Sequence, residues 1–162
     1  MTERIPELRV AARAIVLDPD DRILLVLFRS PHTGETWWAT PGGALDPGER
    51  HEDAVRRELM EEAGIVPGAL GPCVWEREAV FPWGERLVRQ VERYFLVRVD
   101  SPELAPQFTR EQLEGEGLHD IRWWTLAELE GSEAVFAPRR LPELVRDLLG
   151  AGPPAHPIDA GV

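Results

Sequence analysis

The segment spanning residues 43–65 (GALDPGERHEDAVRRELMEEAGI) constrains this chain most, because it predicts both a helix and a cluster of acids. On a helix that advances about 100° per residue, Glu58, Glu61 and Glu62 lie within about one turn on one face. Like charges at this spacing destabilise a helix and raise one another's pKa unless a cation neutralises them. Carboxylate oxygens without thiols or paired histidines suit Mg2+ or Mn2+, ions that work most often on phosphates. The segment therefore predicts a metal site.

The same segment resembles the Nudix box, the signature of Nudix hydrolases, and fills every fixed position of it. These positions are Gly43, Glu49, Arg57, Glu58, Leu59, Glu61, Glu62, Gly64 and Ile65. The resemblance extends to WWATPGG (37–43) before the box and to DIRWWTLAEL (120–129) after it. It implies a nucleotide pyrophosphohydrolase that uses Mg2+ or Mn2+ and cleaves a nucleoside diphosphate linked to another group.

The resemblance also implies roles for individual residues. Metal ligands would be the Gly42 carbonyl and the side chains of Glu58, Glu61 and Glu62. Glu49 and Arg57 would pair to fix the loop against the helix and so orient the carboxylates. The general base differs among family members: Glu58 and Glu61 are the first candidates, and the downstream candidates are Glu114, Glu116 and Asp120.

Size and charge set broader limits. A chain of 162 residues suits one domain with a single core, and we expect that domain to span residues 1–150, followed by a flexible tail at 151–162. The net charge of −11 disfavours nucleic acid and anionic membranes as partners and favours a small nucleotide received through a cation. The charged start, the short apolar runs and the single Cys73 predict a cytoplasmic protein. A homodimer is left open.

Periodicity and turn residues predict the order of the elements. Strands are expected at 8–17, 22–29, 37–40 and 121–124, with a hairpin formed by 73–80 and 87–99 around residues 82–85. Helices are expected at 50–63 and 141–149, and a short helix is expected to begin at the capping box formed by Thr125 and Glu128. The polar segment 101–117 is expected to be a long loop. Strands with flanking helices indicate an α/β fold, which the resemblance sharpens to an α/β/α sandwich around a mixed β-sheet.

Two alternatives to a nucleoside triphosphate substrate remain at this stage. Sixteen residues separate Pro82 from the end of the box, near where ADP-ribose-cleaving relatives carry a proline, so ADP-ribose or another nucleotide sugar is one alternative. A non-catalytic nucleotide sensor is the other, although its box would normally be eroded. Most of the six tryptophans are expected in the core, with one or two lining a pocket. Arg29 would end its strand near the site, where a surface position explains it better than a phosphate contact does.

Overall fold

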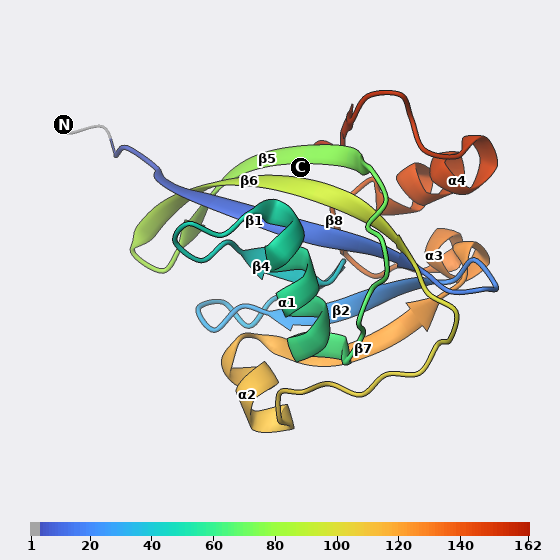
Figure 1. The fold of residues 1–162 in the computed structure, drawn as a ribbon. Coiled ribbons are helices and arrows are strands. Elements are labelled where there is room, and N and C mark those ends of the chain that lie inside the picture. The colour runs from blue at the N-terminus through green and yellow to red at the C-terminus, as the bar shows by residue number, and fades with distance from the viewer. Residues whose placement is uncertain (1–3) are drawn as a thin grey trace.

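The computed structural model describes residues 4–162, which form one mixed β-sheet flanked by helices (Figure 1). The strands are β1 (Glu7–Leu17), β2 (Ile23–Arg29), β3 (Thr36–Ala39), β4 (Gly42–Ala44), β5 (Cys73–Trp83), β6 (Arg86–Arg98), β7 (Leu118–Trp124), β8 (Phe136–Ala137) and β9 (Ile158–Asp159). The helices are α1 (His51–Ala63), α2 (Arg110–Gly115), α3 (Leu126–Gly131) and α4 (Leu141–Ala151). None of the helices in this part of the chain is long and apolar enough to cross a membrane.

The central strand of the sheet is β1. The order of the main path is β8-β3-β2-β1-β6-β5-β9, with β4 added to β1 and β7 added to β2. β1 pairs with β6 in parallel along its whole length, but its register with β2 is limited to Leu17 and Ile23. β1 and β2 therefore diverge, and β4 pairs with the part of β1 that β2 leaves free, at residues 11–13.

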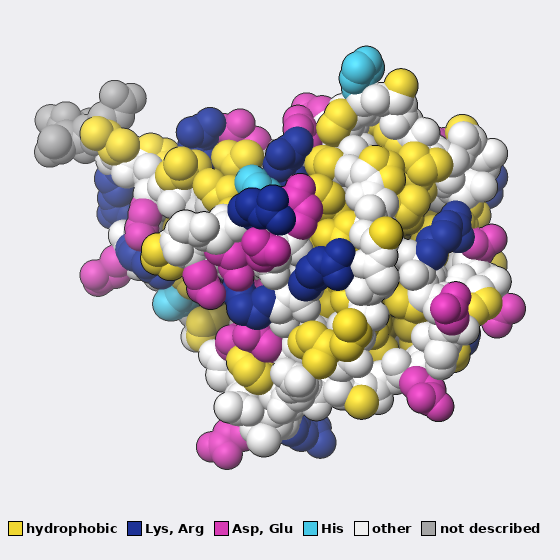
Figure 2. Space-filling view, viewed as in Figure 1, with side chains coloured by type: hydrophobic (Ala, Val, Ile, Leu, Met, Phe, Trp, Pro, Cys, Tyr) yellow, Lys and Arg dark blue, Asp and Glu magenta, His cyan; other side chains and the backbone are white. Residues whose placement is uncertain are grey.

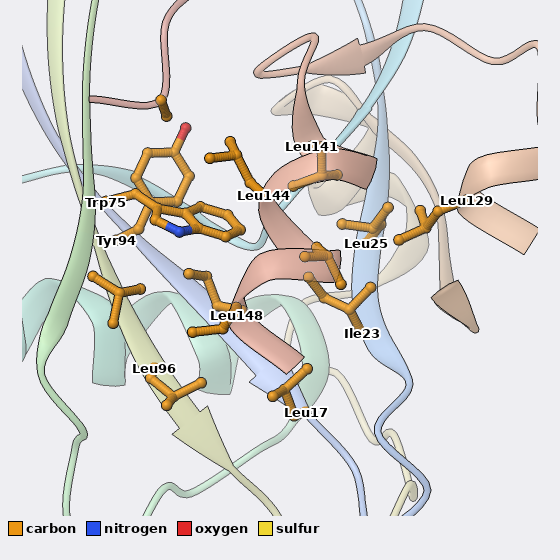
Figure 3. Packing of buried hydrophobic residues seen from close by; sticks show 14 of the residues in the cluster. Leu17, Ile23, Leu25, Trp75, Tyr94, Leu96, Leu129, Leu141, Leu144 and Leu148 are labelled. Atoms are coloured by element: carbon orange, nitrogen blue, oxygen red, sulfur yellow. The ribbon is translucent and has the colours of Figure 1, made fainter. Parts of the chain in front are cut away.

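Two apolar layers sandwich the sheet. Successive residues of β1 point to opposite faces, as a strand requires: Ala14 and Val16 pack with α1, whereas Ile15 and Leu17 pack beneath α4. On the α4 side, Leu144 and Leu148 lie against Trp75 and Tyr94 from the β5–β6 hairpin (Figure 3). This arrangement confirms the predicted α/β/α sandwich.

Local sequence signals account for the helix ends. α1 ends at Gly64, whose φ of 68° lies in the left-handed region. A Cβ at this position would lie 1.7 Å from the Ala105 carbonyl oxygen, so no other residue fits here without a shift. α3 begins with the predicted capping box, in which Thr125 and Glu128 each bond the other's backbone amide. α4 carries Pro142 in its first turn, where proline's missing N–H has no partner to lose.

The structure corrects several element boundaries. The expected loop 101–117 contains α2, which is opened by a second capping box at Thr109 and Gln112. The hairpin turn is tighter than predicted, so that Pro82 and Trp83 belong to β5. β7 begins at Leu118 rather than at residue 121.

The C-terminal segment also differs from the expected tail. α4 continues to Ala151, and the residues after it form β9, which pairs in parallel with β5. Ala160 is fully buried in the α4-side core, and its amide donates to the Glu76 carbonyl at 2.8 Å. Backbone hydrogen bonds to β5 and the buried Ala160 therefore hold this segment in place, although it has few apolar side chains.

Candidate active site

Helix α1 positions the acidic residues of the site through its apolar stripe. Val55, Leu59 and Ala63 are fully buried and hold α1 on the sheet. Because Glu58, Glu61 and Glu62 lie on the flank of that stripe, docking of the helix turns them toward β4. Figure 2 shows acidic and arginine side chains interleaved over the region of α1.

Three carboxylates meet at the edge of α1. Glu58, Glu61 and Glu116 each offer an oxygen, and these atoms all lie within 4.8 Å of one another. Glu116 follows α2 and is one of the three downstream acids that the sequence offered as candidates for the general base. Of the other two, Glu114 pairs with Arg110 at 3.2 Å, and Asp120 accepts from the Ile121 amide at 2.8 Å. We call Glu58, Glu61 and Glu116 the acid cluster.

Glu62 lies outside the acid cluster. Its side chain is buried, and its Oε2 accepts from the Gly42 amide at 3.3 Å. The Gly42 carbonyl in turn accepts from Arg13 Nη1 at 3.3 Å. Of the four predicted ligands, the structure brings Glu58 and Glu61 together and holds Glu62 and Gly42 against each other beside them.

The pKa values of three acids in and beside the acid cluster are raised, first by burial and then by the neighbouring carboxylates. Burial, and then the charge of Glu58, raise the pKa of Glu61. Burial, and then Glu58 and Glu61, raise the pKa of Glu116. Burial and its hydrogen bond with Glu58 raise the pKa of Glu62 well above the ordinary value. Oxygen donors that repel one another at this spacing fit a hard divalent cation, which would neutralise them.

Arg57 links the acid cluster to the loop before α1. It binds both Glu49 oxygens at 3.0 Å and donates to the Ala44 carbonyl at 3.1 Å. It also reaches Glu58 at 2.9 Å and Glu61 at 3.4 Å. The hydrogen bond from Arg57 lowers the pKa of Glu49, so this pair is charged near neutral pH. The Glu49–Arg57 contact predicted from the resemblance is thus present in the structure.

Two glycines let β4 approach its neighbours closely. A Cβ on Gly42 would lie 2.2 Å from the Ala12 carbonyl oxygen, and the residue has a φ of 144°. A Cβ on Gly43 would lie 2.7 Å from Glu58 Oε1. Side chains at these positions would push β4 away from β1 and from the acid cluster.

Two hollows that share lining residues adjoin the acid cluster. The larger, of about 1400 Å3, is lined by Gly43, Glu58 and Glu116 and extends over β1, β5 and β6. The smaller, of about 490 Å3, lies between the end of β2 and the turn after α2. Both are lined by Glu116, Trp37 and Trp83.

The tryptophans divide as predicted. Trp75 and Trp124 are buried in the core, and Trp38 and Trp123 pack against it. Trp37 and Trp83 line the hollows. Arg29 lines the smaller hollow, at the end of β2 where the sequence predicted it.

Comparisons with known proteins agree with this geometry. Residues 7–146 match the model of the family described as the NUDIX domain. A putative mutator protein MutT4 of Mycobacterium tuberculosis is 28% identical over 142 residues, which cover 85% of this chain and 54% of that protein. An uncharacterized Nudix hydrolase, YvcI of Bacillus subtilis, is 46% identical over 50 residues, covering 31% of this chain and 29% of its own. The chain thus spans less than two thirds of the length of these curated relatives.

Solved structures show the same fold. A MutT NUDIX hydrolase from Burkholderia pseudomallei superposes with a TM-score of 0.63 at 26% identity, covering 84% of this chain and 95% of that one. The NUDIX domain of Shewanella oneidensis NrtR, solved in complex with ADP ribose, gives a TM-score of 0.66 at 22% identity and covers 90% of each chain. With the family model matched over most of its length, the chain belongs to the Nudix hydrolase family.

Proposed function

We propose that this protein is a Mg2+- or Mn2+-dependent pyrophosphohydrolase that cleaves a phosphoanhydride bond in a nucleoside diphosphate linked to another group. The observation that carries the proposal is the acid cluster, whose three carboxylate oxygens lie within 4.8 Å of one another. Residues on two separate elements, α1 and the turn after α2, supply these oxygens. Bringing like charges together does not stabilise the fold, so a bound cation is the simplest reason for this arrangement.

The residues around the acid cluster have distinct parts in this proposal. Glu58, Glu61 and Glu116 would hold the cation, with the Gly42 carbonyl and Glu62 as further candidate ligands. A bound divalent cation supplies charge neutralisation at phosphate oxygens and increases the acidity of water. Arg57 keeps Glu58 and Glu61 in place through its bonds to both. Glu58 and Glu61 are the candidates to accept the proton of the attacking water, and Glu116 joins them from the downstream acids.

Titration of metal is the direct test of the site. We expect calorimetry to show Mg2+ or Mn2+ binding that Glu58→Gln and Glu61→Gln each weaken at least tenfold. In chelator, the same variants should melt at the temperature of the parent or above it, because each removes one repelling charge. Metal binding equal to that of the parent in both variants would refute the site.

Hydrolysis of a nucleotide panel tests the reaction. The panel should contain nucleoside triphosphates, ADP-ribose and 5′-triphosphorylated RNA, since relatives that match this chain include proteins named RNA pyrophosphohydrolase. ADP-ribose is favoured as a second candidate by the complex reported for the NrtR domain, and the larger hollow is roomy enough for a dinucleotide-sized ligand. A parent that binds a nucleotide yet cleaves nothing would be a sensor instead of an enzyme.

A further inference from the structure

We propose that the part of the large cavity lined by β1, β5 and β6 binds a phosphate group of the substrate other than the two joined by the scissile bond. The inference rests on the proposed function, which supplies a nucleotide as the ligand. It names a substrate class: nucleotides that carry an additional phosphate, either as a monoester on the sugar or as a further member of the phosphate chain.

The first observation is a change of side-chain type along one face of the sheet. Trp75 of β5 and Tyr94 of β6 belong to the core under α4. On the same face, Arg77 stands two residues after Trp75, and its cross-strand partner Glu92 stands two residues before Tyr94. Both line the cavity. Charged groups at inward-facing strand positions are costly unless they are paired. These two pair with each other at 2.6 Å and make this part of the cavity polar.

The second observation is the charge balance of this wall. Four arginines from β1, β5 and β6 line it, joined by Arg139 from the segment after β8, against the carboxylates of Glu7 and Glu92. Glu92 binds Arg13 at 2.5 Å and Arg77 at 2.6 Å, and Glu7 reaches Arg86 at 3.5 Å. Five guanidinium groups against two carboxylates leave an excess of three positive charges, in a protein whose net charge is −11.

The remaining two arginines of the wall, Arg9 and Arg139, carry charge that residues 4–162 do not neutralise by an ion pair. Arg9 is hydrogen-bonded to the neutral amide of Gln90. The Arg9 and Arg139 side chains are both solvent-exposed at the cavity edge and can reach a ligand there.

Phosphate is the anion that this wall suits best. Guanidinium groups bind phosphate oxygens through paired, charge-assisted hydrogen bonds. The scissile phosphates need a cation at the acid cluster, where the protein is negative. A further phosphate at the arginine wall needs none, because the protein supplies the positive charge itself.

The test compares ligands that differ by one phosphate. With Mg2+ present, we expect adenosine 2′,5′-bisphosphate to bind the parent at least tenfold more tightly than AMP. In hydrolysis, ADP-ribose 2′-phosphate against ADP-ribose tests the monoester, and diadenosine tetraphosphate against the triphosphate tests the longer chain. The preference should weaken as ionic strength rises.

Variants assign the preference to the wall. Arg9→Gln and Arg139→Gln should each reduce the preference at least threefold, and Arg9→Lys should keep part of it. The matched control is Arg89→Gln, since Arg89 lies on β6 but pairs with Glu78 on the opposite face of the strand. The control should leave the preference unchanged.

The outcomes separate this inference from the proposed function. Equal affinity for AMP and the bisphosphate, together with equal kcat/KM within both substrate pairs, would overturn the inference even if hydrolysis is rapid. A preference that survives in both glutamine variants would overturn it as well. Tighter binding of the bisphosphate that depends on Arg9 and Arg139, without any hydrolysis, would support the phosphate site and refute the proposed reaction.

Discussion

At the scale of single residues, acids that the sequence treats alike differ sharply in their surroundings. Glu116 meets Glu58 and Glu61, whereas Glu114, two residues earlier, lies on the surface against Arg110. No spacing rule distinguishes the two, because their placement depends on how the turn after α2 meets α1. The proximity of Glu58 and Glu61 could be predicted because one helix fixes their spacing, whereas Glu62 on the same helix turns to the Gly42 amide. Glu116 could only be one of three candidates.

Glu116→Gln and Glu114→Gln form a matched pair that tests this difference. We expect Glu116→Gln to weaken Mg2+ binding about tenfold and to lower turnover by about 100-fold, which corresponds to roughly 2.7 kcal/mol in the barrier. Glu114→Gln should change neither by more than twofold. Calorimetric metal titration and steady-state kinetics on the best substrate measure both effects. Equal behaviour of the two variants would remove Glu116 from the site.

Arg57 should act through orientation. Arg57→Ala removes its bonds to Glu49, to the Ala44 carbonyl and to two acids of the cluster. We expect turnover to fall by at least tenfold, with metal affinity changed by less than about fivefold, because the ligands themselves remain. Arg50→Ala, which breaks an exposed pair at the start of the same helix, should have little effect on either. Loss of metal binding in parallel with turnover would mean that the loop has collapsed.

At the scale of elements, length and amphipathic pattern decide what sequence reasoning recovers. α1 has an apolar stripe and a glycine end signal, and its predicted bounds agree with the structure to within one residue. α2 carries the same type of capping box as α3, but none of its six residues is buried, so no periodic pattern reveals it. β4 and β8 have three and two residues, too few for alternation to appear.

Two alanine-to-aspartate substitutions measure how much the C-terminal segment contributes to the free energy of unfolding. Ala160→Asp buries an unpaired charge in the core beneath α4 and should destabilise the fold by roughly 2–4 kcal/mol. Ala155→Asp adds the same charge at an exposed position of the same segment and should cost less than about 0.5 kcal/mol. Urea unfolding measures both. Equal stability of the variants would show that residues 151–162 behave as the flexible tail expected from composition.

At the scale of the whole molecule, the Arg13–Glu92–Arg77 network joins the lining of the larger hollow to the stability of the sheet. Burial alone would raise the pKa of Glu92, but Arg13 and Arg77 hold it at about 2, below the ordinary value of 4.5. A lowered folded-state pKa stabilises the protein above the unfolded value, and this stabilisation is lost as the pH falls toward the folded value.

Acid titration of stability should reveal this network. The difference in unfolding free energy between the parent and Glu92→Gln should be largest above about pH 5. It should shrink by up to roughly 3 kcal/mol as the pH falls to 2, since only the parent takes up the proton there. Glu103→Gln, on the exposed loop after β6, should follow the parent across the range. A difference that does not depend on pH would mean that the network contributes no charge pairing to stability.

The parallel pairing of β1 with β6 also has a consequence for synthesis on the ribosome. Each residue of β1 finds its β6 partner 81 positions later in the chain, from Glu7 with Val88 to Leu17 with Arg98. The apolar residues of the central strand therefore emerge long before the strand that covers them, with only short contacts to β2 and β4 available meanwhile. Such distant pairing slows folding and lengthens the time in which a nascent chain can aggregate. The partner that completes the central strand is translated only after the whole of α1, so Glu58 and Glu61 are made before that strand and Glu116 is made after it.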